Sequence, residues 1–405
     1  MFEKLEAGAA RLAMRVGLIA YLWLSRIAGK IVAPRPAAPA NRPLSILLTG
    51  TFHSDNWARS HILPLARSPR CGTLTVVTTF ELAPLPGVTI VRPSDWQIRV
   101  AGAVVARMVR FGVEALRARP DVVGGFHLLF NGLWAGLLAR FVGARSLYFC
   151  VVGPVEVIDG GVHTENRLVE RIGTADRTIE RRLLDAVRNF DFIVTMGTRA
   201  RSYFESHGVF GECRVIPGAV DAASFAVLPG ARDYDLVLVA RLVAIKRIDR
   251  FLQVVDGVRR RRPGVRAVVV GDGPLRASLE RLVADLDLAR HVTFAGRQSD
   301  VGWWLARARV FVLTSESEGL SLSLMEAMTS GLPAVVPAVG DLPDLVEDGR
   351  NGYLVAGEGF ADYVSPILRL LECEGEWRTF SEAARHASLR FQLERTSACW
   401  SELLA

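Results

Sequence analysis

The stretch Val310–Pro337, VFVLTSESEGLSLSLMEAMTSGLPAVVP, decides the fold of this chain. It predicts a buried strand over Val310–Leu313 and then a polar loop. A short helix from about Ser321 to Thr329 follows, and a second buried strand begins near Pro333. A strand, a helix and a second strand in close succession are typical of a parallel α/β sheet.

Two carboxylates, Glu318 and Glu326, lie eight residues apart across the junction between this loop and this helix. Such a junction presents backbone N–H groups and partial positive charge to an anion. Acidic side chains beside an anion site need a separate reason, and the hydroxyls of a sugar and a ribose next to a phosphate supply one. Glu316 of the same loop is expected to be a solvated side chain.

The length of the chain predicts two domains, because 405 residues are too many for one ordinary core. From Leu44 onward, short apolar runs alternate with longer helical patterns, as in βα units. We expect an α/β fold of two Rossmann-like, doubly wound domains over residues 41–220 and 221–376 that face a central cleft. Helices over residues 377–405 would cross back to the first domain. Ligands of such folds bind at the carboxyl ends of the strands.

The composition describes a basic globular protein with a net charge of +7, a pI of about 9.5 and a mean hydropathy of +0.25. A basic surface suits nucleic acid, anionic lipid or phosphorylated substrates, and a GC-rich genome that often encodes arginine explains the same excess. We expect no nucleic-acid partner, because the charges are not interleaved with aromatic residues. The five cysteines are scattered without a CxxC pair, which favours a reducing compartment over disulfides or a zinc site.

Residues 1–40 differ from the rest and are interpreted as a membrane-association segment followed by a linker. Residues 9–32 are apolar, contain Tyr21 and Trp23, and are interrupted by basic residues. Between Arg15 and Arg26 lie ten residues, fewer than the roughly 20 that a spanning helix needs. The pattern favours a basic helix that lies in the membrane interface. A helix packed on the first domain and a secretory signal are the alternatives.

A second informative stretch is DLVLVARLVAIKRID, residues 235–249. An apolar strand ends at Ala240, and Arg241 and Lys246 lie in the loop before the next helix. Cations at a strand's carboxyl end can stabilise a departing diphosphate without a metal. Taken alone, two such residues in a loop are more often solvated surface.

Four motifs, in this order, resemble the nucleotide-sugar domain of the retaining glycosyltransferases of family 4. They are ARLVAIKRID (240–249), VGDGPL (270–275), SESEGL…MEAM…GLP (315–333) and G…LVEDGRNGYLV (340–355). The resemblance implies the GT-B fold, a nucleoside-diphosphate sugar as donor, transfer of a hexose with retention of configuration, and no bound metal or other cofactor.

The resemblance also implies roles for particular residues. Arg241 and Lys246 would hold the diphosphate, Glu318 the hydroxyls of the donor sugar, and Glu326 the ribose. The rest of the donor pocket would be formed by Gly271, Arg297 and the backbone amides of Gly319 and Leu320.

Glu326 has an alternative explanation. In Ser323-Leu-Met-Glu326 the serine and the glutamate have the spacing of a capping box, in which the glutamate reaches back to the backbone of the cap residue. Spacing alone favours the cap, and the resemblance favours the ribose.

The first domain carries fewer motifs. DVVGGFHLLFNG, residues 121–132, resembles the segment in which the family places a histidine at the reaction centre, here His127. A lone histidine in an apolar setting is as often structural. The loop after the first strand has only Gly50 where the family has several glycines. His163 and Glu165 are weaker candidates on the acceptor side.

Two Asp-x-Asp pairs, Asp233/Asp235 and Asp285/Asp287, have the spacing used by metal-dependent glycosyltransferases. The first pair precedes a strand and the second lies near a helix end. Neither therefore predicts a metal site after a strand.

Together these patterns predict a retaining glycosyltransferase that acts on a glycan or lipid-linked acceptor in bacterial envelope or exopolysaccharide biosynthesis. We expect a cytoplasmic location with peripheral contact to the inner face of the membrane. The alternatives are a nucleotide-sugar epimerase on the same fold and a non-catalytic sugar-nucleotide-binding protein.

Overall fold

The computed structural model describes residues 2–36, 39, 42–52, 54–162, 164, 169, 172–209, 211–225, 232–357 and 359–405. These residues form two compact units. The first unit comprises Met1–Ala219 and Leu393–Ala405, and the second comprises Val220–Gln392. The chain thus returns to the first unit at Leu393, whereas the sequence placed the start of the returning helices at residue 377.

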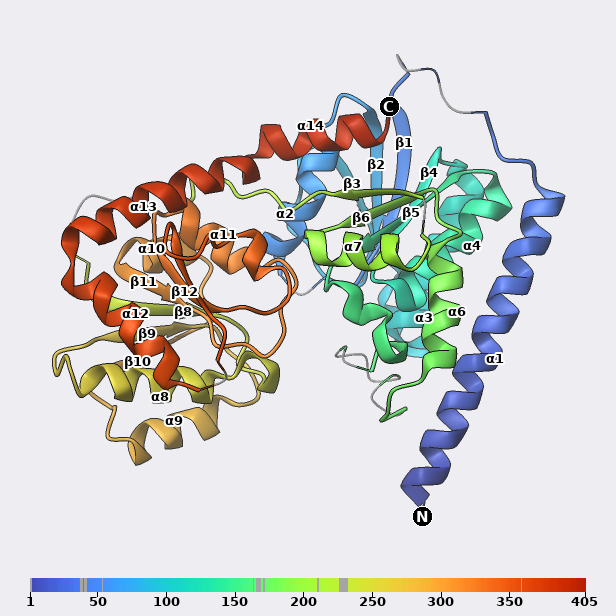
Figure 1. The fold of residues 1–405 in the computed structure, drawn as a ribbon. Coiled ribbons are helices and arrows are strands. Elements are labelled where there is room, and N and C mark those ends of the chain that lie inside the picture. Colours follow the sequence, from blue (N-terminus) through green and yellow to red (C-terminus); the bar gives the residue numbers. More distant parts are fainter. Residues whose placement is uncertain are drawn as a thin grey trace. The chain divides into compact units, whose positions relative to one another are not determined.

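The first unit is built on a parallel sheet with the strand order β3-β2-β1-β4-β5-β6-β7 (Figure 1). Its strands are β1 (Leu44–Thr49), β2 (Cys71–Val77), β3 (Val88–Val91), β4 (Val122–Phe126), β5 (Arg145–Cys150), β6 (Phe192–Thr195) and β7 (Glu212–Val215). Its helices include α1 (Phe2–Ile31), α2 (Asp55–Ala66), α3 (Asp95–Ala118), α4 (Leu133–Val142), α6 (Arg177–Val187), α7 (Thr198–Ser206) and α14 (Leu393–Leu403).

Helices cover both faces of this sheet, so its strands are apolar on both sides. Leu47 and Val123 face α3 and α4 in one buried cluster. Phe149 faces the other way and lies between Phe126, with ring centroids 4.1 Å apart, and Trp400 of α14, at 5.3 Å. The last helix of the chain is therefore part of the core of the first unit.

Helix α1 packs on the outside of α4 and α6, not on the sheet (Figure 1). Leu18, Tyr21 and Leu22 are buried in this contact. Arg15 fixes the helix further, because its guanidinium lies 2.7 Å from the carboxylate of Asp176. One face of α1 is therefore packed on the first unit, as in the alternative interpretation of a helix packed on the first domain.

The opposite face of α1 is exposed, and only 17% of its most apolar window is buried. By length and composition alone, Glu6–Ile31 is long and apolar enough to cross a membrane, with a mean hydropathy of 1.3. The ten-residue run between Arg15 and Arg26 therefore does not by itself exclude a span.

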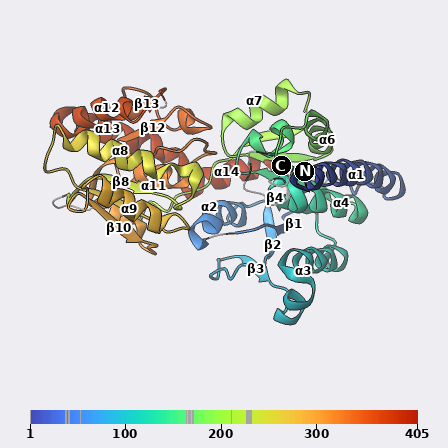
Figure 2. The same ribbon diagram turned by 90° about the horizontal axis from the view of Figure 1, so that it is seen from below.

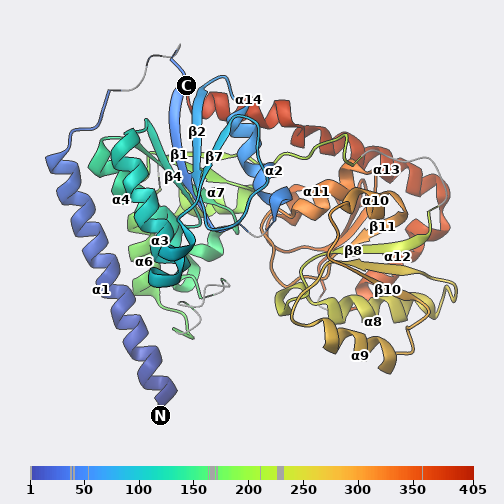
Figure 3. The same cartoon turned by 180° about the vertical axis from the view of Figure 1, so that it is seen from behind.

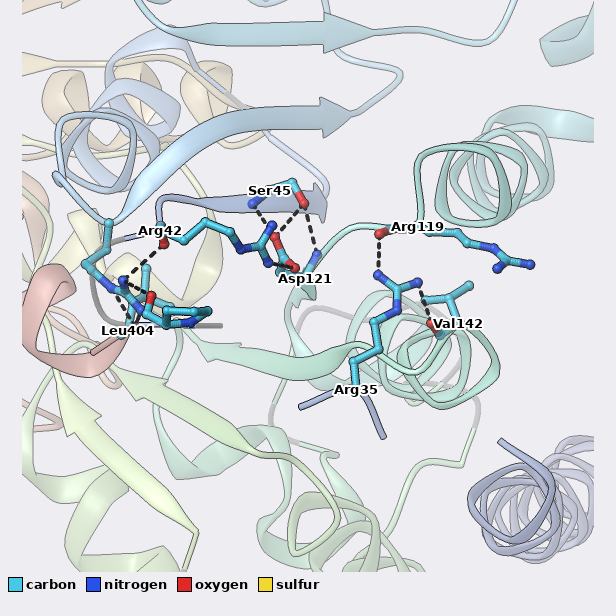
Figure 4. A network of polar contacts seen from close by, with 9 residues as sticks. Arg35, Arg42, Ser45, Arg119, Asp121, Val142 and Leu404 are labelled. Atoms are coloured by element: carbon cyan, nitrogen blue, oxygen red, sulfur yellow. Dashed lines mark hydrogen bonds and ion pairs between the residues drawn. The ribbon is translucent and has the colours of Figure 1, made fainter. Parts of the chain in front are cut away.

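The segment after α1 is anchored to the first unit (Figure 4). Arg35 donates hydrogen bonds to the backbone oxygens of Arg119 and Val142, at 2.7 and 2.8 Å. Asp121 accepts from the backbone N–H and the hydroxyl of Ser45, both at 2.8 Å, and pairs with Arg42. The predicted linker is thus tied to the sheet near the start of β1.

The second unit contains a parallel sheet with the strand order β10-β9-β8-β11-β12-β13. Its strands are β8 (Tyr234–Val239), β9 (Ala267–Val270), β10 (Val292–Gly296), β11 (Ala308–Val312), β12 (Ala334–Pro337) and β13 (Gly352–Val355). Its helices are α8 (Ile248–Arg259), α9 (Arg276–Asp285), α10 (Val301–Ala306), α11 (Leu322–Thr329), α12 (Ala361–Glu372) and α13 (Glu374–Ser388).

Alternate residues of these strands enter two different cores, as the two-residue period of a strand requires. Val310 and Val312 of β11 pack in the cluster with α8, α9 and α12. Phe311 and Leu313 pack in the cluster with α11 and with Ala384 of α13. Because neighbouring strands are parallel, the loops after β10, β9, β8 and β11 emerge in that order along one edge of the sheet.

Candidate functional site

The centre of the candidate site is an ion pair between loops that follow two neighbouring strands. Lys246 ends a turn after β8 (Ala244–Lys246), and its Nζ lies 2.7 Å from both carboxylate oxygens of Glu318. Ser315 donates its hydroxyl to Glu318 Oε1 at 2.6 Å. The Glu318 side chain is 6% exposed and that of Lys246 is 20% exposed. The carboxylate is thus held in place while the ammonium group remains within reach of a ligand.

Further contacts hold the two loops together. The Thr314 hydroxyl donates to the backbone oxygen of Arg247 at 2.8 Å, and the Glu316 N–H donates to the backbone oxygen of Ile245 at 2.9 Å. Glu316 also pairs with Arg247 at 2.6 Å. Its side chain is 54% exposed, in accord with a loop residue at the surface.

Because Gly340 has no side chain, the backbone of the loop that carries Glu318 can pass close to it. Its φ is +58°, a conformation that favours glycine, and a Cβ at this residue would lie 1.7 Å from the backbone oxygen of Glu318. No other residue type fits without moving the loop. The glycine lies in one of the motifs quoted above, but only the structure connects it to Glu318.

Glu326 lies inside α11 and is 3% exposed. The N-cap of α11 is Ser321, whose hydroxyl accepts from the Leu324 N–H at 3.4 Å. The alternative prediction of a capping box between Ser323 and Glu326 is therefore wrong. The N-cap is Ser321, two residues before Ser323, and Glu326 lies beyond the first turn of the helix. Gly319 and Leu320, directly before this cap, are partly exposed.

The remaining donor candidates follow the adjacent strands. Gly271 comes directly after β9, its N–H donates to the Gly296 oxygen at 2.8 Å, and a Cβ there would lie 1.9 Å from the Ala240 oxygen. Arg241 and Arg297 follow β8 and β10, and both are exposed. The sheet thus places the loops that carry the predicted donor residues, with the exception of Glu326 in α11, on one edge of the second unit.

In the first unit, His127 follows β4 in a strained backbone conformation, with φ at +65°. Its Nδ1 lies 3.3 Å from Glu156 Oε1, and Glu156 is 4% exposed. Glu156 also accepts from the Leu128 N–H at 2.6 Å and from the Tyr148 hydroxyl at 2.9 Å. Burial first, and then Cys150 and Glu156, raise the pKa of Tyr148 well above its usual range, so it stays a donor.

Glu156 is a functional candidate that the sequence did not identify. It lies in a single turn (Pro154–Glu156) after β5, the strand beside β4, and the chain separates it from His127 by 29 residues. Its position in a loop after a predicted strand is the feature of the sequence that could have identified it. His163 and Glu165 lie outside the described residues.

A buried arginine connects the loops after β1 and β4. Arg107 of α3 donates to the Gly50 oxygen at 3.1 Å, to the Thr51 hydroxyl at 2.9 Å and to Asn131 Oδ1 at 2.7 Å. Burial lowers the pKa of Arg107 to about 10, so it is still charged at neutral pH. Gly50 lies against the rings of Phe126 and Phe52, and a Cβ at this residue would lie 3.0 Å from the nearest atom of each ring.

The Asp-x-Asp pairs are engaged elsewhere. Asp235 accepts from the Arg266 N–H at 2.9 Å and lies 3.2 Å from Arg262. Asp287 is almost fully exposed. Across the described ranges, no three His, Cys, Asp or Glu side chains are grouped so that they could hold a metal ion.

Two parallel α/β units, each with its candidate residues at the carboxyl ends of the strands, are the architecture of the GT-B fold. The family model described as "Glycosyl transferases group 1" matches residues 221–387, almost the whole second unit. The second unit therefore matches the group 1 glycosyl transferases in sequence.

One curated relative is similar to the chain in sequence, and two solved structures are similar to it in fold. The chain is 28% identical over 293 residues, 67% of this chain and 72% of the other, to the "GDP-mannose-dependent alpha-(1-6)-phosphatidylinositol monomannoside mannosyltransferase" of Mycolicibacterium smegmatis. Anabaena Alr3699/HepE in complex with UDP has a TM-score of 0.67 at 17% identity, over 87% of this chain and 97% of that one. Sucrose-phosphate synthase from Thermosynechococcus elongatus has a TM-score of 0.70 at 18% identity, over 87% and 96%.

Several other curated relatives align only through about a third of this chain and about a third or less of their own length. The family model lies in the second unit, while the solved structures cover 87% of this chain and so extend the fold to both units.

Proposed function

We propose that this chain is a retaining, metal-independent glycosyltransferase that moves a hexose from a nucleoside-diphosphate sugar to a glycan or lipid-linked acceptor. The observation that carries the proposal is the contact of Lys246 with Glu318. It places a cation beside a carboxylate that can accept hydrogen bonds from sugar hydroxyls, at the carboxyl ends of the strands of a parallel sheet. An epimerase and a non-catalytic binding protein remain the alternatives.

In the proposed mechanism, the donor diphosphate binds Lys246 and Arg241, which stabilise the negative charge that grows as it leaves. Glu318, released from part of its contact with Lys246, accepts hydrogen bonds from hydroxyls of the donor sugar. Glu326 receives the ribose, and Gly271, Arg297 and the amides of Gly319 and Leu320 complete the donor pocket.

The transfer forms a bond between an acceptor oxygen and the anomeric carbon, and it breaks the bond from that carbon to the diphosphate. The acceptor attacks on the face from which the diphosphate departs, and its proton passes to the leaving diphosphate oxygen. The configuration at the anomeric carbon is therefore retained. His127, held by Glu156, would hydrogen-bond the donor sugar or orient the acceptor hydroxyl.

Bacterial envelope or exopolysaccharide assembly is the proposed setting. The Mycolicibacterium smegmatis relative is, by its name, a mannosyltransferase that acts on a phosphatidylinositol mannoside. A similar lipid-linked acceptor would explain why this chain carries α1, whose outward face presents Leu12, Val16, Ile19 and Trp23. We propose a cytoplasmic enzyme in peripheral contact with the inner face of the membrane through residues 9–32.

The donor is tested by thermal unfolding of the full chain with a panel of UDP-, GDP- and ADP-sugars. A ligand that binds only the folded state raises the unfolding midpoint. We expect one nucleotide class to raise it in the parent but not in Lys246→Ala or Arg241→Ala. Arg281→Ala, an exposed change on α9, is the matched control. An unchanged response in both site variants would show that the donor binds elsewhere.

The reaction class is tested with the donor found in this way. NMR of the product should show the anomeric configuration of the donor, and activity should persist after treatment with EDTA. An inverted product, or activity that requires an added divalent cation, contradicts the proposal. Release of free nucleotide at the same rate without any acceptor would favour the epimerase.

The contact through α1 is tested by the variant Leu12→Glu, Val16→Glu, Ile19→Glu, which changes only exposed positions and leaves the packed face intact. Binding of the full chain to vesicles that contain phosphatidylglycerol should weaken. Equal binding of the parent and this variant would remove α1 from the proposal.

A further inference from the structure

Helix α3 presents a continuous apolar face to solvent. Its large side chains are between 48% and 80% exposed, and we call them the α3 face: Trp96, Val100, Val104, Val105, Val109, Val113 and Leu116. Single exposed apolar residues are ordinary on a protein surface. A run of them along one helix marks an interaction site.

The packing of α3 explains why this face is open. Its buried residues lie in the second half and include Arg107, Phe111 and Ala115. Gly102 interrupts the helix with φ at +78°, and no atom lies within 4 Å of the place where its Cβ would be. No residue from Asp95 to Val105 is buried. Figure 2 shows α3 beside α4 at the periphery of the first unit.

The charges around the α3 face are mainly positive. Arg92, Arg99, Arg117 and Arg119 are exposed near the two ends of the helix. Asp95 is an exposed acid at the first residue. Glu114 lies 2.8 Å from Arg110 and is thereby neutralised. Between Arg99 and Arg110 no exposed charge interrupts the apolar run, because Arg107 is buried.

This distribution fits the interface of an anionic lipid bilayer. Valine side chains would enter the boundary between headgroups and acyl chains, arginines at both ends would meet lipid phosphates, and Trp96 would lie at headgroup depth. The apolar residues form a ridge on an outward helix, which suits a deformable lipid surface.

Neighbouring helices also expose apolar side chains. Helix α4 contacts both α3 and α1 (Figure 3). It exposes Phe141. Helix α1 in turn exposes Trp23 and other apolar residues. Exposed apolar side chains thus occur on three adjacent helices, which is more than one docked protein segment would cover.

We propose that the α3 face is a membrane-docking surface that binds anionic bilayers in addition to α1. The occupant is the lipid surface itself, recognised by apolar insertion and by the flanking arginines. This inference extends the membrane contact proposed for α1, and it does not depend on the donor site or on the reaction class.

The test compares two variants of the full chain with the same change in net charge. The α3 variant is Val100→Glu, Val104→Glu, Val109→Glu, at exposed positions of the α3 face. The control variant is Ala277→Glu, Ser278→Glu, Ala284→Glu, at exposed positions of α9. Binding is measured by co-sedimentation with vesicles of phosphatidylcholine plus phosphatidylglycerol and with vesicles of phosphatidylcholine alone.

We expect the α3 variant to bind the anionic vesicles about tenfold more weakly, or worse, while the control stays close to the parent. The parent should bind phosphatidylcholine alone much more weakly than the mixed vesicles. Unfolding midpoints of both variants should match the parent, and Val100→Ser, Val104→Ser, Val109→Ser provides a milder version if the first variant does not fold. The donor-induced rise in midpoint should be the same in all of them.

Three outcomes would overturn the proposal. One is equal vesicle binding by the α3 variant and the parent, and another is equal loss in the control. The third is a parent that is dimeric by light scattering and becomes monomeric in the α3 variant with unchanged vesicle binding. In that case the α3 face would be a contact between two copies of this chain.

Discussion

Lys246 Nζ lies 2.7 Å from both carboxylate oxygens of Glu318, although 72 residues separate them in the chain. The pair is mostly buried, with one further hydrogen bond from Ser315. Each charge therefore depends on the other in the absence of a ligand. A bound donor diphosphate could replace Glu318 as the partner of Lys246. The contact would then serve both the stability of the fold and the binding of the donor.

Removing Lys246 alone should affect both stability and activity. Lys246→Met leaves the Glu318 carboxylate with little compensation and should lower the free energy of unfolding by about 1–3 kcal/mol. Activity should fall by about 10²–10³-fold, since a charge on the leaving group loses its partner. Urea unfolding and initial rates measure the two effects.

The double variant Lys246→Met, Glu318→Gln separates the two roles. Without the unpaired carboxylate, the free energy of unfolding should return to within about 1 kcal/mol of the parent, while activity stays low. Recovery of activity together with stability would mean that the pair serves the fold alone.

Gly340→Ala should disturb the Glu318 loop. The added Cβ would lie 1.7 Å from the Glu318 oxygen, so the backbone has to move, and we expect a loss of about 2–4 kcal/mol and weaker donor binding. Gly349→Ala is the control, because Gly349 has φ at +73° but no atom within 4 Å of a Cβ. It should cost about 1 kcal/mol and leave donor binding unchanged. Equal effects of both changes would show that the close approach is unimportant.

Glu156→Gln tests the positioning of His127. The amide oxygen can still accept from Leu128 and Tyr148, but the negative charge near His127 Nδ1 is lost. We expect kcat to fall by about 10–10²-fold with little change in the donor KM, and the pH–rate profile to shift.

The same loss should appear in His127→Gln, and the two changes together should cost little more than one, because they remove one unit. Glu205→Gln, at an exposed glutamate paired with Arg201, is the control. A normal pH–rate profile in Glu156→Gln would leave Glu156 with a purely structural role.

His61 predicts a specific acid sensitivity. Burial, followed by the nearby charge of His127, lowers the pKa of His61 to about 3. The unfolded chain binds a proton at this residue below about pH 6.5, whereas the folded chain does not until near pH 3. Stability therefore falls as the pH drops through this window, by at most roughly 5 kcal/mol from this residue.

His61→Asn should flatten that part of the stability curve. The free energy of unfolding of the parent and the variant should differ most near neutral pH and converge as the pH falls. Chemical unfolding at several pH values measures this. Parallel curves would show that His61 already titrates normally in the folded chain.

Much of the second unit follows from the sequence, for a local reason. The strand at Val310, the helix that ends at Thr329 and the strand that follows are each specified by apolar pattern and turn residues within a few positions. The predicted start of that helix near Ser321 is confirmed, whereas the alternative capping box of Ser323 is wrong, because both serines are suitable cap residues and only the packed backbone selects one.

The first unit was less predictable, because its candidate groups come from separate strands. Glu156 has no motif, and only the neighbouring positions of β4 and β5 bring it to His127. The outward face of α3 was likewise invisible, since its valines have the same pattern whether they are buried or exposed. In helix α1, too, only the structure shows which apolar residues are packed on the first unit and which are exposed.

By itself, the sequence determined the α/β class and the family resemblance, because local pattern and motif carry that information, and it proposed the donor residues. Only the tertiary structure decided which charges meet. Lys246 reaches Glu318, Gly340 makes room for it, and Glu156 holds His127, because the order of parallel strands places loops from distant parts of the chain side by side.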